Sequence, residues 1–217
     1  MAASDTLRIT EIFFSLQGET STVGLPTVFI RLTGCPLRCQ YCDTAYAFSG
    51  GDIWTLTRIL EQVASYGARY VTVTGGEPLA QALCIKLLTQ LCDADYQVSL
   101  ETSGAMDIRQ VDARVTTILD LKTPASQECD RNLETNIALL KPIDQVKFVI
   151  CDRRDYDWSK AKIDQFDLRN RVAEILFSPS FNELSYAELA AWILQDRLPV
   201  RMQLQLHKII WGDKPGH

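Results

Sequence analysis

The 217-residue sequence contains no run of lysines or arginines and no long apolar stretch. Phosphate binding along nucleic acid needs clustered cations, and a membrane-spanning helix needs about 20 apolar residues. Binding to nucleic acid and insertion into a membrane are therefore both disfavoured. The net charge is −5 and 47% of the residues are hydrophobic, as in a globular protein with one sizeable core.

The first residues, Met-Ala-Ala-Ser-Asp, also lack the basic and apolar regions of a signal peptide. The cysteine pattern agrees with this, because seven cysteines are an odd number and three of them are clustered rather than dispersed as disulfide partners. We expect a reducing, cytoplasmic setting. Repeats, low-complexity blocks and linkers are absent as well, so the economical interpretation is a single domain over residues 1–217.

Strands and helices alternate along most of the chain. Runs rich in Ile, Val and Phe predict strands at 7–14, 27–32, 70–74, 97–101, 116–121, 145–150, 173–177 and 200–206. Helical patterns fall at 55–66, 79–91, 108–113, 133–140, 155–166 and 186–195. This alternation predicts an α/β fold with a parallel sheet and helices outside it. Too few strand–helix units fit in the chain for a full eight-stranded barrel of about 250 residues.

Three cysteines, Cys35, Cys39 and Cys42, follow the spacing Cys-x3-Cys-x2-Cys. Thiolates favour iron–sulfur clusters, zinc and Cu(I). An electron-carrying [4Fe–4S] cluster normally takes four cysteines, and structural zinc is closed by four ligands. Three cysteines therefore indicate a cubane with one iron left open. A zinc site with His207 as fourth ligand stays open as the alternative, although the chain has no zinc-ribbon partner pair.

The cysteine triad resembles the signature of the radical S-adenosylmethionine (SAM) superfamily. The surrounding segments resemble more narrowly the 7-carboxy-7-deazaguanine synthase family, from about Leu7 to about Trp211. They read SLQGE at 15–19, FIRLTG at 29–34, CDT at 42–44, TGGEP at 74–78, ETSG at 101–104 and LHK at 206–208. The resemblance implies an abbreviated, open parallel (βα) barrel. It also implies conversion of 6-carboxy-5,6,7,8-tetrahydropterin to 7-carboxy-7-deazaguanine and ammonia, by radical ring contraction.

The resemblance further implies that the open iron binds SAM and that the Thr44 hydroxyl ligates Mg²⁺. Magnesium accepts hard oxygen ligands and usually binds through few protein groups plus substrate. A threonine after Cys-Asp is otherwise a loop residue that bonds its own backbone, and this interpretation stays open.

The residues that the resemblance assigns to SAM lie in four segments, three of them at or just after the ends of predicted strands, where α/β folds build their sites. They are Tyr41, Cys42, Asp43, Gly75, Gly76, Glu77, Gly104, Asp120, Leu121 and Lys122. The alternative for the Gly-Gly-Glu-Pro segment is a plain strand–turn–helix joint with Glu77 near the helix start. The alternative for Glu-Thr-Ser-Gly is a polar turn.

A second set is assigned to the substrate: Leu16, Gln17, Gly18, Glu19, Arg31, Thr102 and His207. A pterin presents a 2-amino-4-oxo edge, which a carboxylate and an amide can pair with, and a guanidinium can grip a carboxylate. Arg31 stands between Ile30 and Leu32, so alternation alone could point it outward into water. His207 could equally be an ordinary surface or core histidine.

Within the single domain we expect a substrate loop at 15–26, a cluster loop at 34–51 and a C-terminal tail at 207–217. The resemblance implies a homodimer, and a flavodoxin-type reductant is implied because the chain has no second cluster motif. Two other functions remain open: another radical SAM reaction, such as activation of a glycyl-radical enzyme, and a non-enzymatic metal-binding interaction protein. The other four cysteines, Cys84, Cys92, Cys129 and Cys151, show no motif, and most are expected to be small buried hydrophobes.

Overall fold

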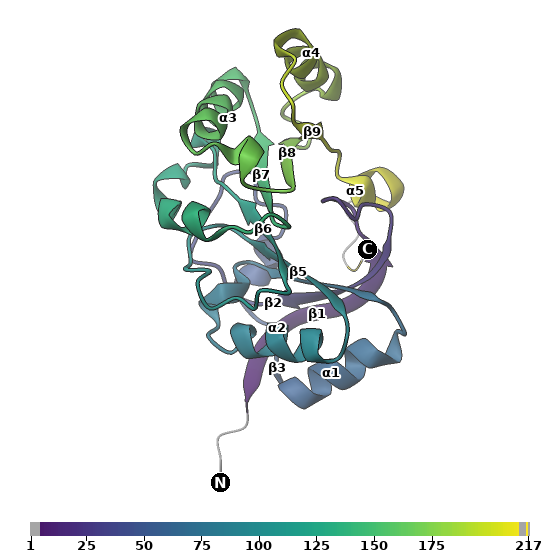
Figure 1. The fold of residues 1–217 in the computed structure, drawn as a ribbon. Helices are drawn as coiled ribbons and strands as arrows, with labels where there is room; N and C mark the ends of the chain where they lie inside the picture. The colour runs from purple at the N-terminus through teal and green to yellow at the C-terminus, as the bar shows by residue number, and fades with distance from the viewer. Residues whose placement is uncertain (1–4, 213–215, 217) are drawn as a thin grey trace.

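The structure, a computed structural model, describes residues 5–212 and residue 216. Its strands form one curved sheet in the order β3-β1-β2-β4-β5-β6-β7-β8-β9 (Figure 1). The strands are β1 Thr6–Leu16, β2 Pro26–Leu32, β3 Asp52–Thr55, β4 Tyr70–Gly75, β5 Gln97–Thr102, β6 Thr116–Asp120, β7 Gln145–Ile150, β8 Glu174–Pro179 and β9 Arg201–Met202. From β2 to β9 all neighbours are parallel, whereas β1 pairs antiparallel with β2 and β3.

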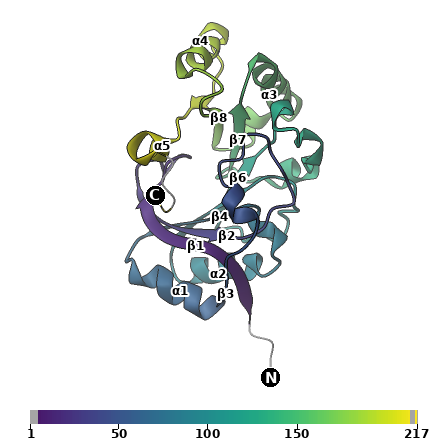
Figure 2. The ribbon, with the colours of Figure 1, turned by 180° about the vertical axis from the view of Figure 1, so that it is seen from behind.

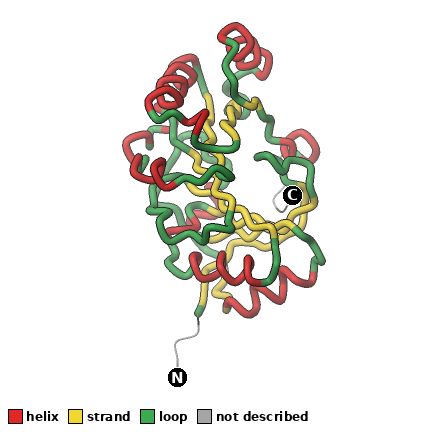
Figure 3. Tube along the Cα trace, in the orientation of Figure 1, coloured by secondary structure: helices red, strands yellow, loops and turns green. Residues whose placement is uncertain are grey.

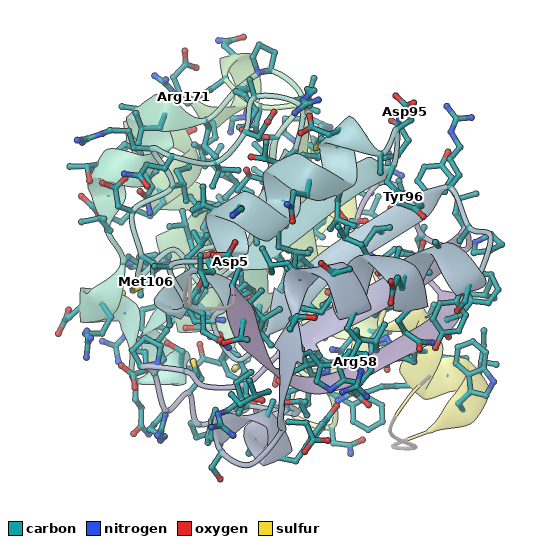
Figure 4. All side chains as sticks on the ribbon, turned by 90° about the horizontal axis from the view of Figure 1, so that it is seen from below. Asp5, Arg58, Asp95, Tyr96, Met106 and Arg171 are labelled. Atoms are coloured by element: carbon teal, nitrogen blue, oxygen red, sulfur yellow. The ribbon has the colours of Figure 1, made fainter. Side chains whose placement is uncertain are left out.

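Helices cover the outside of this curved wall of strands (Figure 3). They are α1 Leu56–Ser65, α2 Cys84–Asp93, α3 Arg153–Gln165 and α4 Tyr186–Asp196. The short helix α5 Leu206–Trp211 lies instead at the cavity, which its residues His207 and Lys208 line. Short 3-10 turns are η1 Ala45–Phe48, η2 Pro78–Ala80, η3 Pro124–Ser126, η4 Cys129–Arg131, η5 Glu134–Leu139 and η6 Leu168–Asn170. Seen from below, α1 and α2 lie side by side across the strands, with Arg58 on α1 and Tyr96 just after α2 (Figure 4).

Side chains alternate between the two faces of the sheet, as strand geometry requires. On β7, Val146 and Phe148 are fully buried beneath the helices, whereas Lys147 and Val149 line a cavity on the other face. On β6, Leu119 belongs to the core and its neighbour Asp120 lines the cavity. The outer face of the sheet therefore carries the hydrophobic core, and its concave face is left for polar side chains.

The helix ends follow local capping chemistry. The Thr55 side chain accepts a hydrogen bond from the backbone N–H of Arg58 at the start of α1 (3.2 Å), and Asp152 does the same for Asp155 in α3 (2.9 Å). In α1 an apolar stripe at helical spacing, Leu56, Ile59 and Val63, is buried against the sheet.

The expected open parallel α/β barrel is confirmed, and the differences are local. The helix expected at 108–113 is a series of turns, because Asp107 and Asp112 accept hydrogen bonds from the backbones of Arg109 and Arg114 (2.8 and 2.9 Å). Such bonds compete with helix formation. The helix expected at 133–140 is the 3-10 turn η5, and the strand β3 was not expected.

The other differences lie at element ends. The helix expected at 79–91 divides into η2 and α2, and the strand expected at 200–206 shortens to β9 before α5 begins. Part of the expected C-terminal tail, residues 213–215 and 217, lies outside the described residues. No helix in the described part of the chain is both long and apolar enough to span a membrane.

Candidate active site

The carboxyl ends of the parallel strands surround a cavity of about 380 Å³. That volume is within the range of small-molecule sites. Thiols, charged groups and aromatic rings border it, among them Phe13, Phe29, Tyr41 and Tyr46. This edge of a parallel α/β sheet is where ligands are bound and oriented.

Cys35, Cys39 and Cys42 lie on the irregular loop after β2, and backbone hydrogen bonds fix this loop. The Gly34 N–H donates to the Ala47 carbonyl (2.8 Å), and the Gln40 N–H donates to the Ser126 carbonyl (3.1 Å). Arg38 folds back onto the loop, where its Nη1 donates to the Cys35 carbonyl (2.8 Å). The loop is thus held in place on both sides while the three thiols border the cavity.

Burial disfavours the ionised form of two of the three thiols, Cys35 and Cys39. Burial above all raises the pKa of Cys39 to about 11, with contributions from Cys42 and Cys35. Within residues 5–212 and 216, no three Cys, His, Asp or Glu side chains converge closely enough to hold a single metal ion. A zinc ion held by these thiols and His207 would need such convergence. A cubane does not, since each thiolate binds a different iron.

The Gly-Gly turn at the end of β4 touches the cysteine loop directly. The Glu77 N–H donates to the Gly34 carbonyl (2.8 Å). A Cβ added to Gly76 would lie 2.4 Å from the Gly34 oxygen and 2.7 Å from the Cys35 Cβ. No side chain fits in that gap, so the close approach of turn and loop requires glycine.

The Glu77 side chain is fully buried and is not among the residues that line the cavity. Its carboxylate accepts hydrogen bonds from the Thr102 hydroxyl (2.9 Å), from the Ser103 N–H (2.7 Å) and from the Leu79 N–H (3.0 Å). Hydrogen bonds to a buried charged group are among the stronger ones in proteins. Glu77 thus ties the end of β4 to the end of β5.

A carboxylate with one unoccupied oxygen stands at the end of β6. Asp120 Oδ2 accepts from Lys122 Nζ (2.9 Å), whereas its buried Oδ1 has no hydrogen-bond partner in the described part of the chain. Burial alone would lower the pKa of Lys122, but Asp120 and Tyr41 raise it, so the ammonium stays charged. Because an unpartnered buried oxygen is costly, Oδ1 is a ready acceptor for a ligand hydroxyl or N–H.

Arg31 faces the cavity from β2. Its Nε donates to Glu11 (2.7 Å), and Tyr46 donates its hydroxyl to the same carboxylate oxygen (2.8 Å). The guanidinium carbon lies within 6 Å of the ring centres of Phe13 and Tyr46. The two terminal nitrogens meet no acceptor among the described residues, so they present a fork that suits a carboxylate.

The loop between β1 and β2 places Gln17 and Glu19 at the cavity. Gln17 Nε2 donates to the Thr72 hydroxyl (3.1 Å), and its Oε1 accepts from the Glu19 N–H (3.2 Å). The Glu19 carboxylate forms an ion pair with Lys147 and accepts from Gln205 Nε2 (3.1 Å). These protein contacts hold both side chains in place.

His207 on α5 closes over the same loop. The Leu206 N–H donates to the Gly18 carbonyl (3.0 Å), and α5 lies beside the end of β1 in both views of the ribbon (Figures 1 and 2). A Cβ on Gly18 would lie 2.3 Å from His207 Nδ1. Burial lowers the pKa of His207, and this effect outweighs the opposing effect of the Glu19 and Asp43 charges. The lowered pKa favours the neutral imidazole.

Thr44 lines the cavity from the cluster loop. Its hydroxyl is 3.8 Å from Cys42 Sγ and makes no capping bond to the following turn, so the backbone-bonded alternative is not found. The neighbouring Asp43 accepts from Gln205 Nε2 (3.2 Å) and pairs with Lys208 (3.3 Å). Burial alone would raise the pKa of Asp43, but Lys208 and Lys147 lower it.

Comparison with known proteins gives a consistent result. The family model described as "Radical SAM superfamily" matches residues 29–120. A 7-carboxy-7-deazaguanine synthase from Chlorobaculum tepidum is 44% identical over 98% of this chain and 97% of its own length. One from Koribacter versatilis is 39% identical over 94% of this chain and 97% of its own length.

The chain belongs to the 7-carboxy-7-deazaguanine synthase family. The crystal structure of QueE from Escherichia coli has the same fold, with a TM-score of 0.72 at 21% identity over 93% of this chain and 95% of that chain. Family membership removes both functional alternatives considered above, the glycyl-radical activase and the non-enzymatic interaction protein.

A radical SAM protein of this family requires a [4Fe–4S] cluster and SAM, and the cavity fits both. Three thiols share one wall with the Gly75-Gly76 turn, and the buried Asp120 Oδ1 lacks a partner in the described part of the chain. Soft sulfur ligands suit the cluster, while an exposed glycine backbone and an unpartnered carboxylate oxygen suit a polar cosubstrate.

The cavity brings together most of the residues that the family resemblance pointed to. Those that line it are Leu16, Gln17, Gly18, Glu19, Arg31, Cys35, Cys39, Tyr41, Cys42, Asp43, Thr44, Gly75, Gly76, Thr102, Asp120, Lys122 and His207. Three others, Glu77, Gly104 and Leu121, lie behind the wall: Leu121 is in the core, and the Gly104 carbonyl accepts from Leu133 and Asn136.

Other lining residues were missed from the sequence: Thr74, Glu101, Lys147, Gln205 and Lys208. For Lys147 a signal exists, because it is a charged residue between two apolar neighbours of a strand, and Glu101 directly follows Leu100 near the end of another strand. A buried charge needs a partner or a function. Gln205 gives no such signal, since its neighbours in sequence do not show that it meets Glu19 and Asp43.

Proposed function

We propose that this protein is the radical SAM enzyme that converts 6-carboxy-5,6,7,8-tetrahydropterin to 7-carboxy-7-deazaguanine and ammonia. The main support is the 44% identity to a 7-carboxy-7-deazaguanine synthase over nearly the full length of both chains. The cavity supports it independently, because three thiols and a carboxylate-binding fork face the same space.

The cluster would be held by Cys35, Cys39 and Cys42, leaving the fourth iron for SAM. When bound, the two groups supply one-electron chemistry that generates a substrate radical. For SAM we propose Gly75, Gly76 and Asp120 as direct contacts. The remaining residues of the SAM set, Tyr41, Asp43, Glu77, Gly104, Leu121 and Lys122, are proposed as contacts or as supports of contacts.

The substrate would lie between Arg31 and the loop of Gln17 and Glu19. The terminal nitrogens of Arg31 suit the 6-carboxylate, and the Glu19 carboxylate suits the amino and N–H donors of the pterin edge. The neutral imidazole of His207 can either donate or accept a hydrogen bond at this wall. Leu16, Gly18 and Thr102 would complete the surface around the ring.

We propose further that Thr44 ligates Mg²⁺ together with oxygens of the substrate. Its hydroxyl lines the cavity next to Cys42, and one protein oxygen is a usual share for a magnesium ion bound with substrate and water.

The arrangement of the chain and its surroundings are proposals as well. We propose one domain, with a substrate loop at 15–26, a cluster loop at 34–51 and a C-terminal tail at 207–217. A cytoplasmic setting is supported by seven free thiols, all within the described residues. A homodimer is supported by exposed apolar side chains such as Phe14, Ile209 and Ile210. A flavodoxin-type reductant is proposed from the single cluster motif.

The test is anaerobic incubation of the cluster-loaded protein with the carboxytetrahydropterin, SAM, Mg²⁺ and a reductant. The expected result is 7-carboxy-7-deazaguanine, detected by mass and absent when SAM is left out. If SAM is cleaved but the pterin stays unchanged, the proposed substrate is wrong.

A further inference from the structure

Lys147 lies in the middle of β7, and its side chain faces the cavity rather than water. Its neighbours Val146 and Phe148 are fully buried in the core, and its own side chain is only 14% exposed. An ammonium so placed is costly unless paired, yet neither the cluster, nor SAM, nor Mg²⁺ calls for a cation here.

The partner of Lys147 is Glu19, which reaches it from the loop between β1 and β2. Burial alone would lower the pKa of Lys147, but Glu19, Asp120 and Glu101 raise it well above its ordinary value. The ammonium is therefore charged, and its strongest contact is a carboxylate that is itself nearly buried, at 11% side-chain exposure.

Two amides from the C-terminal segment complete the surroundings of Glu19. Gln205 Nε2 donates to Oε1 (3.1 Å), and Gln203 Nε2 lies 3.4 Å from Oε2. Gln203 also accepts from the Thr20 N–H (2.8 Å) and donates to the Ser178 hydroxyl (3.1 Å), so it anchors the loop itself. Among these donors Lys147 is the charged one.

We propose that Lys147 is a positioning residue whose ammonium holds the Glu19 carboxylate aimed at the donor edge of the substrate ring. This inference rests on the proposed function, because it takes the ring edge to be that of a pterin. Lys147 would act through Glu19 rather than on the substrate carboxylate, since its charge is already matched while the terminal nitrogens of Arg31 are free for that anion.

The first measurement compares Lys147→Met with Lys147→Arg in the reconstituted holoenzyme. Loss of a hydrogen bond to a charged group is expected to raise KM for the pterin about 10- to 100-fold in Lys147→Met, with the affinity for SAM unchanged. Lys147→Arg keeps the charge and is expected to restore most of the pterin affinity. The matched control is Lys160→Met, which removes a lysine from the outer helix α3 and should leave KM unchanged.

A double-mutant cycle with Glu19→Gln decides how Lys147 acts. If it works through Glu19, adding Lys147→Met to Glu19→Gln should change KM by less than about threefold. A full effect of Lys147→Met in that background would overturn the inference, and so would an unchanged KM in the single variant. Iron content and melting temperature check that the variants are folded, and Lys147→Gln replaces the Met variant if that one does not fold.

Failure of this inference is distinguishable from failure of the proposed function. In the first case the wild-type protein makes the deazapurine while KM does not depend on Lys147. In the second case the wild-type protein itself neither binds nor converts the pterin.

Discussion

The two walls of the cavity are built in different ways. The cofactor wall consists of the three cysteines and the Gly75-Gly76 turn. There, short motifs meet through backbone contacts, such as the hydrogen bond from the Glu77 N–H to the Gly34 carbonyl (2.8 Å). The substrate wall consists of the loop with Gln17 and Glu19 and the side chains that hold it. There, side chains far apart in sequence meet: Lys147 and Glu19 are 128 positions apart, and Gln203 and Thr20 are 183 apart. The chemistry of the first wall is therefore visible in local sequence, whereas that of the second appears only after folding.

The largest expected effect is on the cofactor wall. Replacing Cys39 by Ala removes one of three thiolates, so the cluster should be lost and product formation should fall below detection. Iron per chain after anaerobic reconstitution is the measurement. Cys129→Ala is the matched control, since Cys129 is partly exposed and does not line the cavity. Full iron content and SAM cleavage in Cys39→Ala would refute the assignment.

A pair of glycine variants separates the two walls. Gly76→Ala places a Cβ against the Cys35 loop, and Gly18→Ala places one against His207. Overpacking of this kind costs about 1–3 kcal/mol. If this cost falls on the ligand-bound form, the affinity for that ligand drops roughly 5- to 150-fold.

We expect Gly76→Ala to weaken SAM binding and cluster retention, and Gly18→Ala to raise KM for the pterin alone. Titrations with SAM and with pterin on each variant give the answer. If both variants change both affinities equally, the two walls are not separate units.

Thr44 lines the cavity next to Cys42, and its variant is expected to have an intermediate effect. Thr44→Ala removes the proposed Mg²⁺ ligand, so half-saturation by Mg²⁺ should rise by about tenfold, a change comparable with loss of one supporting group at a metal site. Thr44→Ser, which keeps the hydroxyl, should behave like the wild type. An unchanged Mg²⁺ response in the Ala variant, with iron content intact, would remove Thr44 from the magnesium site.

The smallest effect is expected from His207 and concerns stability. Its pKa is lowered in the folded protein, so at mildly acidic pH the unfolded chain binds a proton that the folded chain does not. The free energy of unfolding should therefore fall as the pH drops below about 6.5, the ordinary histidine value. Denaturant unfolding at several pH values should show a shallower fall in His207→Gln. An identical slope in both proteins would show that His207 does not contribute.

Much of the fold was predictable because alternating strands and helices have distinct periods. The errors lie where side chains act on the backbone: Asp107 and Asp112 turn the chain where a helix was expected. The strand expected at 200–206 is longer than the observed β9, because Gln203 and Gln205 alternate with leucines as in a strand. Their side chains are instead used to hold Glu19 and Thr20.

The site was predictable in proportion to how local it is. Cys35, Cys39 and Cys42 could be read from spacing alone, and their lining of one cavity agrees. The motif predicts Glu77 beside SAM, and this stays a prediction. The structure adds that its side chain is buried against Thr102 and Ser103, a contact between two strand ends that one motif cannot reveal. Lys147 was missed for the same reason, since its partner stands on a distant loop.

The central claim is that three thiolates hold a cubane whose fourth iron is left for SAM. Electron paramagnetic resonance of the reduced, reconstituted protein with and without SAM tests it most directly, together with iron counting. We expect four irons per chain and a spectrum that changes when SAM is added. A single tightly bound zinc, or a four-iron spectrum that is the same with and without SAM, would contradict it.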